Sequence, residues 1–476
     1  MKTLQTEVAI IGAGTAGMTA YRAASEHSDR VLVIEGGPYG TTCARVGCMP
    51  SKLLIAAAEA AHMIEDAPAF GVHAGPLRID GVAVMQRVRE ERDRFVGFVV
   101  DAVARWPEAH RLRGQARFLD DHTLQVDDHT RVEAGRIVIA TGSRPAVPRG
   151  WRDALGERVI VNDDVFDWQD LPRSVAVVGT GVIGLELAQA LHRLGVRVKL
   201  YGRGGRVGPL TDPVLQALSR RLFEAALPLS AQAKGLQVRR DGDEVVVAVP
   251  GLPDERFDWL LAATGRHPNV DDLGLDRTSL PLDPAGVPVF DRRTGQIGVS
   301  PVFIAGDVGE RHPLLHEAAD DGRIAGDNAG RWPDVRVRPR RAALSVVFSD
   351  PQIMSAGLGH AALVEAGIGF ETGAVSFEDQ GRSRVIRRNA GALHVYGERT
   401  SGRFLGAEMI GPAAEHLGHL LSWSVQRGDT VQQMLDSAFY HPVIEEGLRT
   451  ALRELQRALR MGPPPVEHCL DCGPGA

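Results

Sequence analysis

The sequence is poor in cysteine and aromatic residues, and it has no long hydrophobic run. Only 4 of its 476 residues are cysteine, and aromatic residues make up 5% of the chain. Four cysteines are too few for the disulfide framework of a small secreted scaffold. Because no run of about 18 apolar residues occurs, the sequence predicts no transmembrane helix and no membrane partner.

Neither sign of charge dominates the chain. It contains 54 lysines and arginines against 60 aspartates and glutamates, a formal net charge of −6. This balance argues against a protein whose main task is to bind the phosphate backbone of a nucleic acid, so we expect no nucleic-acid partner. The first apolar run, residues 8–11, leads directly into a glycine loop and has no signal-peptide features. We therefore expect a cytoplasmic protein, where paired cysteines indicate redox chemistry or metal binding.

Glycine, in contrast, is abundant, and the first glycine-rich loop has a specific pattern. Gly12, Gly14 and Gly17 follow an apolar run, a helical stretch comes next, and a second apolar run ends in Glu35. The first glycine permits the tight turn, the second lets a pyrophosphate approach the backbone, and the third lets helix and strand pack closely. A carboxylate at the end of the second strand binds ribose hydroxyls. The segment predicts a dinucleotide-binding site, with an accidental glycine-rich turn as the alternative.

The same strand, loop and helix pattern recurs from residue 175. The loop glycines of this second unit are Gly179, Gly181 and Gly184. Two such units indicate two dinucleotide-binding domains in one chain.

The second unit differs from the first at the end of its second strand. No carboxylate stands where Glu35 stands in the first unit; Gly202 is followed instead by Arg203 and Arg206. An acid there would favour NAD(H), whereas positive charge favours the 2′-phosphate of NADP(H). We therefore expect NADP(H) to be preferred over NAD(H). The alternative is that both arginines are solvated loop residues.

Two cysteines lie just beyond the first dinucleotide unit. Cys43 and Cys48 precede Lys52, and a helical pattern follows. Cys48 should therefore lie near a helix start, where the helix dipole and the lysine stabilise a thiolate. The positions predict a disulfide that cycles against a cofactor in the first domain, with two structural thiols as the alternative.

The C-terminal part of the chain contains two further candidates. His441 precedes a helical stretch containing Glu446, which predicts an acid–base pair or a surface histidine at a helix start. Cys469 and Cys472 stand in a Pro- and Gly-rich end beside His468. Three interpretations of this pair remain open: a redox-active arm, a metal-binding tail, or an end without a role.

Together these motifs resemble the flavin-dependent pyridine nucleotide–disulfide oxidoreductases, the family of dihydrolipoamide dehydrogenase, glutathione reductase and mercuric reductase. The resemblance covers nearly the whole chain, and the order and spacing of the motifs are specific. It implies an FAD enzyme that works as a homodimer on a small-molecule disulfide or dithiol, with no resident metal. The implied fold is α/β, with two Rossmann-like dinucleotide-binding domains and a C-terminal α+β interface (dimerisation) domain. The expected segments are 1–150 for FAD, 151–270 for NAD(P), 271–344 for a return to the central domain, 345–461 for the interface and 462–476 for a flexible arm.

The resemblance also assigns roles to individual residues. Cys48 would face the flavin and Cys43 would exchange with the substrate, while His441, oriented by Glu446, would serve the active site of the other subunit. Lys52 would lie near the flavin and pair with Glu186. The expected cofactor contacts are Gly12, Gly14, Gly17, Glu35, Thr141, Gly142 and Asp307 for FAD, and Gly179, Gly181, Gly184, Arg203 and Arg206 for the nicotinamide nucleotide.

The substrate stays open because neither main branch of the family is matched fully. Arg45 stands between the two cysteines, where Asn is common, and would lower a thiol pKa or attract an anionic substrate. The leading prediction is an NAD(P)H-dependent reductase of an unidentified low-molecular-weight disulfide. The alternatives are a dihydrolipoyl dehydrogenase that passes electrons to NAD, a mercuric-type metal-ion reductase, and a redox-sensing flavoprotein.

Overall fold

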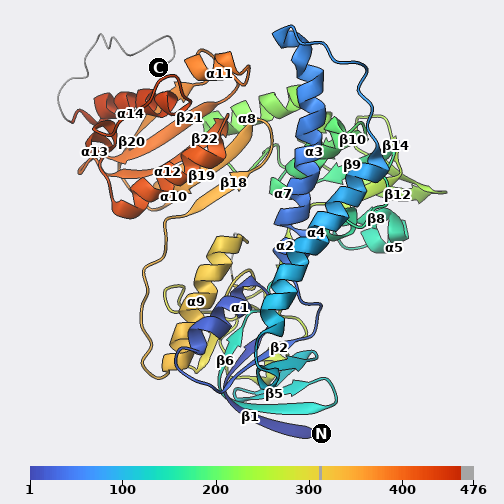
Figure 1. Ribbon diagram of the computed structural model, residues 1–476, viewed down its shortest axis with the longest axis vertical. Helices are drawn as coiled ribbons and strands as arrows, with labels where there is room; N and C mark the ends of the chain where they lie inside the picture. Colours follow the sequence, from blue (N-terminus) through green and yellow to red (C-terminus); the bar gives the residue numbers. More distant parts are fainter. Residues whose placement is uncertain (310–312, 462–476) are drawn as a thin grey trace.

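The computed structural model describes residues 1–309 and 313–461. The three largest of five sheets organise this part of the chain (Figure 1). The first has the order β3-β2-β1-β6-β5-β4, and β17 also pairs with β6. Its central strands are buried apolar runs in parallel register, which is typical of a sheet covered by helices. Its strands are β1 (Lys2–Ile11), β2 (Val31–Glu35), β3 (Arg111–Arg113), β4 (Ala116–Asp120), β5 (Thr123–Val126), β6 (Thr130–Ile139) and β17 (Val302–Ile304).

The second sheet is entirely parallel and has the order β11-β10-β9-β15-β8. Helix α7 follows the second glycine loop, as α1 follows the first. The elements are β8 (Val159–Ile160), β9 (Ser174–Val178), β10 (Arg197–Tyr201), β11 (Leu229–Ser230), β15 (Trp259–Ala262), α1 (Thr15–Ala24) and α7 (Val182–Arg193).

The third sheet is antiparallel and has the order β18-β19-β22-β21-β20. Helix α12 packs on β19 and β22, and α14 packs on β20 and β21. The expected α/β fold with two Rossmann-like domains and a C-terminal α+β domain is confirmed. The elements are β18 (Leu344–Val347), β19 (Gln352–Gly357), β20 (Phe370–Ser376), β21 (Ala392–Glu398), β22 (Phe404–Gly411), α12 (Ala414–Arg427) and α14 (Glu445–Leu459).

Two long helices join the first two domains. Helix α3 (Cys48–Asp66) starts at the cysteine pair and packs against α7 of the second domain, and α4 (Gly81–Ala104) packs beside it (Figure 1). The start of α3 therefore lies where the first two domains meet. No helix in the described ranges is both long and apolar enough to cross a membrane.

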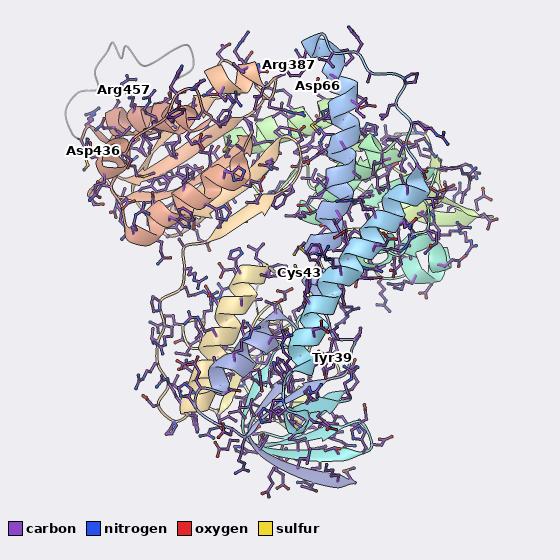
Figure 2. The ribbon with its side chains drawn as sticks, viewed as in Figure 1. Tyr39, Cys43, Asp66, Arg387, Asp436 and Arg457 are labelled. Carbon is purple, nitrogen blue, oxygen red and sulfur yellow. The ribbon has the colours of Figure 1, made fainter. Side chains whose placement is uncertain are left out.

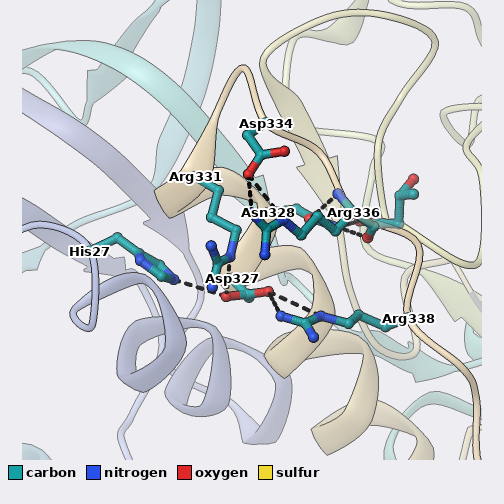
Figure 3. A network of polar contacts seen from close by, with 8 residues as sticks. His27, Asp327, Asn328, Arg331, Asp334, Arg336 and Arg338 are labelled. Atoms are coloured by element: carbon teal, nitrogen blue, oxygen red, sulfur yellow. Dashed lines mark hydrogen bonds and ion pairs between the residues drawn. The ribbon is translucent and has the colours of Figure 1, made fainter.

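An ionic network holds the segment that leads to the third domain. Asp327 of α9 (Leu315–Arg331) accepts hydrogen bonds from His27 (2.8 Å), Arg331 (2.9 Å) and Arg338 (2.7 Å), as Figure 3 shows. His27 follows α1, and Arg338 lies on the extended connection after α9. One buried carboxylate thus ties α1, α9 and this connection together.

Candidate active site

A cavity of about 1890 Å³ joins the first glycine loop to the cysteine pair. It extends from the carboxyl end of the first sheet past the start of α3 to the second and third domains. Figure 2 shows Cys43 near the middle of the molecule. The expected site residues that line it are Gly12, Gly14, Glu35, Cys43, Cys48, Lys52, Thr141, Gly142, Glu186 and Asp307.

The first glycine loop has the shape that a bound dinucleotide requires. Gly12 has a φ of +106°, and a Cβ there would lie 2.4 Å from the carbonyl oxygen of Ala140. A Cβ at Gly17 would lie 1.9 Å from the carbonyl oxygen of Gly12. In contrast, a Cβ at Gly14 would meet nothing within 4 Å, so the loop is open there towards the cavity. This open turn at a helix start fits a pyrophosphate.

Glu35 is held beside this loop. Its carboxylate accepts hydrogen bonds from the backbone N–H groups of Ala13 (2.7 Å) and Gly37 (2.7 Å). The side chain also lines the cavity, so its remaining lone pairs can accept hydrogen bonds from ribose hydroxyls. The residues present at the first loop therefore fit FAD.

The second loop repeats the geometry of the first. A Cβ at Gly179 would lie 2.0 Å from the carbonyl oxygen of Ala263, and one at Gly184 would lie 1.8 Å from the carbonyl oxygen of Gly179. A Cβ at Gly181 would again meet nothing within 4 Å. The residues of this loop fit the pyrophosphate of a second dinucleotide.

The structural register shows which residue replaces the acid in the second unit. The N–H of Gly12 donates to the carbonyl of Ile34, and the N–H of Gly179 donates to that of Tyr201, both at 2.8 Å. Gly202 therefore occupies the position of Glu35. A Cβ at residue 202 would lie 2.8 Å from Cγ2 of Thr180, so the threonine fills the space that an acidic side chain needs.

The two arginines after Gly202 lie in different surroundings. The guanidinium of Arg206 donates a hydrogen bond to the carbonyl of Leu210 at 3.1 Å and so holds its own loop. Arg203 is exposed and forms no side-chain hydrogen bond or ion pair with any residue that the structure describes. Arg203 is thus the better placed of the two to bind a phosphate.

The cysteine pair is polarised. Cys43 lies in α2 (Thr42–Val46), Cys48 is the first residue of α3, and both thiols are free. A hydrogen bond from Cys43 lowers the pKa of the Cys48 thiol to about 7, against the effect of burial, and the charge of Lys52 adds to the lowering. The hydrogen bond to Cys48 and burial together raise the pKa of Cys43. Cys48 is therefore the more acidic thiol of the pair and Cys43 the less acidic one.

The expected partner of Lys52 is in place. Its Nζ lies 2.8 Å from Oε2 of Glu186, a residue that is only 4% exposed. The other oxygen of Glu186 accepts the backbone N–H of Phe348 at 2.9 Å, and Nζ lies 4.7 Å from the centroid of the Phe348 ring. This ion pair joins α3, α7 and the C-terminal domain directly beside Cys48.

His441 and Glu446 also form the expected pair. Nδ1 of His441 lies 3.0 Å from Oε1 of Glu446, which is 2% exposed and also accepts a hydrogen bond from Arg449 at 3.1 Å. The histidine side chain is 64% exposed. Neither residue is among the described residues that line the cavity. Within one chain, therefore, the histidine does not reach the cysteine pair.

Comparison with known proteins agrees with this geometry. Residues 6–322 match the pyridine nucleotide-disulphide oxidoreductase family, and residues 344–452 match the dimerisation domain of that family. The chain belongs to the pyridine nucleotide-disulphide oxidoreductases. It is therefore a flavin-dependent enzyme that uses FAD and NAD(P)H and acts on sulfur groups.

Two named branches of the family are represented among its relatives. The oxidoreductase is 32% identical over 464 residues to a mercuric reductase of Streptomyces lividans, with 94% of this chain and 95% of that protein covered. It is 27% identical over 454 residues to a dihydrolipoyl dehydrogenase of Bacillus subtilis, with 93% and 95% covered.

Solved structures share the fold. The HOCl-induced flavoprotein disulfide reductase RclA from Escherichia coli superposes with a TM-score of 0.79 at 22% identity, covering 94% of this chain and 99% of that one. LpdA from Mycobacterium tuberculosis also gives a TM-score of 0.79, at 24% identity and with the same coverage of each chain.

Sequence reasoning missed three residues at the oxidoreductase's cavity: Arg266 and Asn269 line it, and Ser143 contacts the lining residues Asp307 and Arg266. Ser143 donates to Asp307 at 3.2 Å and receives a hydrogen bond from Arg266 at 2.8 Å. Burial raises the pKa of the Asp307 carboxyl, and the Ser143 hydrogen bond opposes this. Asn269 fixes the turn at Thr141 by accepting from its hydroxyl at 2.7 Å. Only the pairing of β7 (Ser143–Pro145) with β16 (Arg266–Pro268) brings these residues together, so no local pattern could reveal them.

The remaining expectations concern the C-terminal cysteine pair and metal binding. Cys469 and Cys472 lie outside the described residues. Within the described ranges, no group of three or more His, Cys, Asp or Glu side chains is arranged to hold a metal ion.

Proposed function

We propose that this oxidoreductase is a homodimeric, NADPH-preferring reductase of a low-molecular-weight disulfide. The observation that carries the proposal is the polarised pair at the cavity. Cys48 lies at the start of α3, beside the Lys52–Glu186 ion pair, and Cys43 lines the cavity next to it; these surroundings lower the pKa of Cys48 and raise that of Cys43. Such a pair suits thiol–disulfide exchange, in which the two sulfurs act in sequence.

The cofactor sites support the first half of the reaction. Gly12, Gly14, Glu35 and Asp307 would hold FAD, and Gly179 and Gly181 would hold the nicotinamide nucleotide. When bound, FAD supplies electron transfer between the nicotinamide and the cysteine pair. Cys48 and Lys52 line the same cavity. The positive charge of Lys52, which lowers the pKa of Cys48, would therefore lie beside the bound flavin.

The chain's own residues carry the second half. The partner subunit's His441 would take the proton of Cys43, whose thiolate then attacks one sulfur of the substrate disulfide, forms a mixed disulfide and displaces the first thiolate. The Cys48 thiolate then attacks the sulfur of Cys43, which forms the Cys43–Cys48 disulfide and releases the second thiol. The leaving thiolates need protons, and the partner subunit's His441, oriented by Glu446, would supply them.

The preference for NADPH is proposed from the second loop. Gly202 replaces the acid, and Arg203 is an exposed cation beside the position of the ribose. Because Arg206 is bound to Leu210, we assign the 2′-phosphate contact mainly to Arg203.

Steady-state kinetics test the proposal. We expect kcat/KM for NADPH to exceed that for NADH, and Arg203→Ala to raise KM for NADPH roughly tenfold, the effect of losing one charge-assisted hydrogen bond. The matched control, Arg206→Ala, should raise it much less. A clear preference of the wild-type enzyme for NADH would contradict the assignment.

The disulfide is to be identified in the same assay. Glutathione disulfide, lipoamide and other small disulfides are compared as acceptors, with dihydrolipoamide and NAD for the reverse direction. Fast oxidation of dihydrolipoamide by NAD would favour the dihydrolipoyl dehydrogenase alternative. NADPH-dependent reduction of Hg²⁺, without turnover of any disulfide, would favour the mercuric-type alternative.

A further inference from the structure

The loop between the two cysteines is held from outside the first domain. Val46 is the last residue of α2, and its carbonyl is one of those that a helix C-terminus leaves without an intrahelical partner. The side-chain amide of Asn162 donates to this carbonyl at 2.9 Å. Asn162 is only 6% exposed and lies two residues after β8, an outer strand of the sheet that carries the second glycine loop.

The amide is itself fixed in orientation. The same Nδ2 donates to Oδ1 of Asp163 at 2.9 Å, and α6 (Asn162–Val165) packs against α2. Burial raises the pKa of the Asp163 carboxyl, and the positive charges of Arg266 and Arg45 oppose that rise. The charge of Arg45 thus acts on Asp163 from the loop, and the direct contact between the start of α6 and the loop is the hydrogen bond from Asn162 to the Val46 carbonyl.

The Val46 carbonyl, held by Asn162, constrains the backbone that sets the distance between the sulfurs of Cys43 and Cys48. The Val46 carbonyl and the N–H of Gly47 share one planar peptide group, so fixing the oxygen fixes the plane that leads into Cys48. Gly47 is tightly packed, because a Cβ there would lie 3.1 Å from the carbonyl oxygen of Thr42 and 3.2 Å from Cα of Cys43. A rotation of this peptide would move Cys48 relative to Cys43.

We propose that Asn162 is a positioning residue of the redox pair, through which the nucleotide-binding domain holds Cys43 and Cys48 at the separation that disulfide formation requires. This inference rests on the proposed role of the two cysteines. A disulfide forms only within narrow limits of distance and angle, so a held loop favours the disulfide over the dithiol. Asn162 touches neither sulfur and acts only through the Val46 carbonyl.

The test is the thiol–disulfide equilibrium of the purified holoenzyme in dithiothreitol buffers of known redox ratio. In this exchange, the two thiols of the pair are oxidised as oxidised dithiothreitol is reduced. The disulfide fraction is measured after acid quenching, by alkylation and peptide mass. Asn162→Leu keeps the side-chain volume and removes the donor. We expect it to shift the equilibrium towards the dithiol by roughly threefold or more, the effect of one lost hydrogen bond.

The matched control is Asn389→Leu. Nδ2 of Asn389 donates to the carbonyl of Glu378, also at 2.9 Å, but in the C-terminal domain. Asn389→Leu should leave the thiol–disulfide equilibrium unchanged even if it lowers the midpoint temperature of unfolding. Asn162→Ser, which is too short to reach Val46, should behave as Asn162→Leu and covers the case in which leucine prevents folding.

A second measurement concerns the Cys48 thiolate, whose neighbours are Cys43, Lys52 and Glu186. The midpoint of the pH profile of Cys48 alkylation should rise in Asn162→Leu, since a displaced Cys48 loses part of its stabilisation. Equilibrium constants and alkylation profiles equal to wild type in both Asn162 variants would overturn the inference. If the wild-type pair itself forms no disulfide, the proposed function fails, and the inference fails with it.

Discussion

At the scale of single residues, Arg45 is the clearest departure from the usual redox loop. It lines the cavity and forms no ion pair with another described residue. Gly40 makes room for it: this glycine has a φ of +125°, and a Cβ there would lie 3.0 Å from Cδ of Arg45 and 2.8 Å from Cγ1 of Val96. The loop thus presents to the cavity, within one turn of Cys43, a positive charge that no described residue pairs with directly.

This charge leads to a prediction about substrate preference. Arg45→Asn should raise KM for disulfides that carry carboxylates by about three- to tenfold, because a surface-accessible cation contributes about 1 kcal/mol to an anion contact. Uncharged disulfides such as lipoamide should be affected little. Steady-state kinetics on a charged and a neutral disulfide measure the difference. Equal losses on both would show that Arg45 acts on the cysteines and not on the substrate.

At the scale of secondary-structure elements, α9 connects the first domain to the third. Arg338 of the connection after α9 pairs with Asp327, and Arg340 pairs with Asp321 and, at 2.7 Å, with Glu317. Glu317 lies in the first turn of α9, where it lines the cavity. The arginine-rich connection is therefore laid along an acidic helix, and its charges stabilise the path of the chain between domains.

Asp327 accepts hydrogen bonds from three side chains, which leads to a prediction about stability. Asp327→Asn should lower the free energy of unfolding by about 1–3 kcal/mol, because three donors lose a charged acceptor in a buried site. Asp334→Asn is the control, since Asp334 pairs only with Arg336 on the surface (Figure 3), and it should change stability by less than about 0.5 kcal/mol. Denaturant unfolding measures both. Equal changes in the free energy of unfolding for the two variants would mean that the buried network does not stabilise the fold.

The same carboxylate predicts a pH dependence. Burial alone would raise the pKa of Asp327, but hydrogen bonds from Arg338, His27 and Arg331 lower it to about 2. A carboxyl whose pKa is lower in the folded state stabilises the fold above its unfolded pKa of about 4. This contribution is lost as the pH falls from about 4 to 2. The stability difference between wild type and Asp327→Asn should therefore shrink over this range.

At the scale of the whole molecule, one chain contains all the expected residues but not in one place. His441 and Glu446 form their pair on the third domain, away from the cavity that contains Cys43. Since residues 344–452 match a dimerisation domain, a second subunit is the natural source of the missing histidine.

Mixed dimers test this arrangement. Cys43→Ser and His441→Gln should each abolish most of the activity as homodimers. Equal co-expression should restore about a quarter of wild-type activity, because half of the dimers are mixed and each has one intact site of two. Mixed dimers purified through separate tags on the two subunits should have about half of wild-type activity, and this activity is the measurement. No recovery in those dimers would place His441 and Cys43 of the same chain in one site, whereas a fully active His441→Gln homodimer would remove the histidine from the reaction.

Much of the fold and of the site could be predicted because the relevant signals are local. The glycine spacing at residues 12–17, the acid at Glu35 and the cysteines at the start of a helix all act through turns and helix ends within a short stretch of chain. Contacts between distant segments were different. The pairing of β7 with β16, which brings Arg266 to Ser143, leaves no local pattern in the chain.

Residue type and spacing alone therefore predicted the chemistry: two dinucleotide loops, a redox pair and an acid–base pair. The tertiary structure decided how these parts are held. Glu186 and Phe348 contact Lys52, and Asn162 donates to the Val46 carbonyl. Thr180 fills the space beside Gly202. Each contact forms because two separate elements pack together. Such contacts depend on the relative placement of three sheets, and no single stretch of chain encodes that placement.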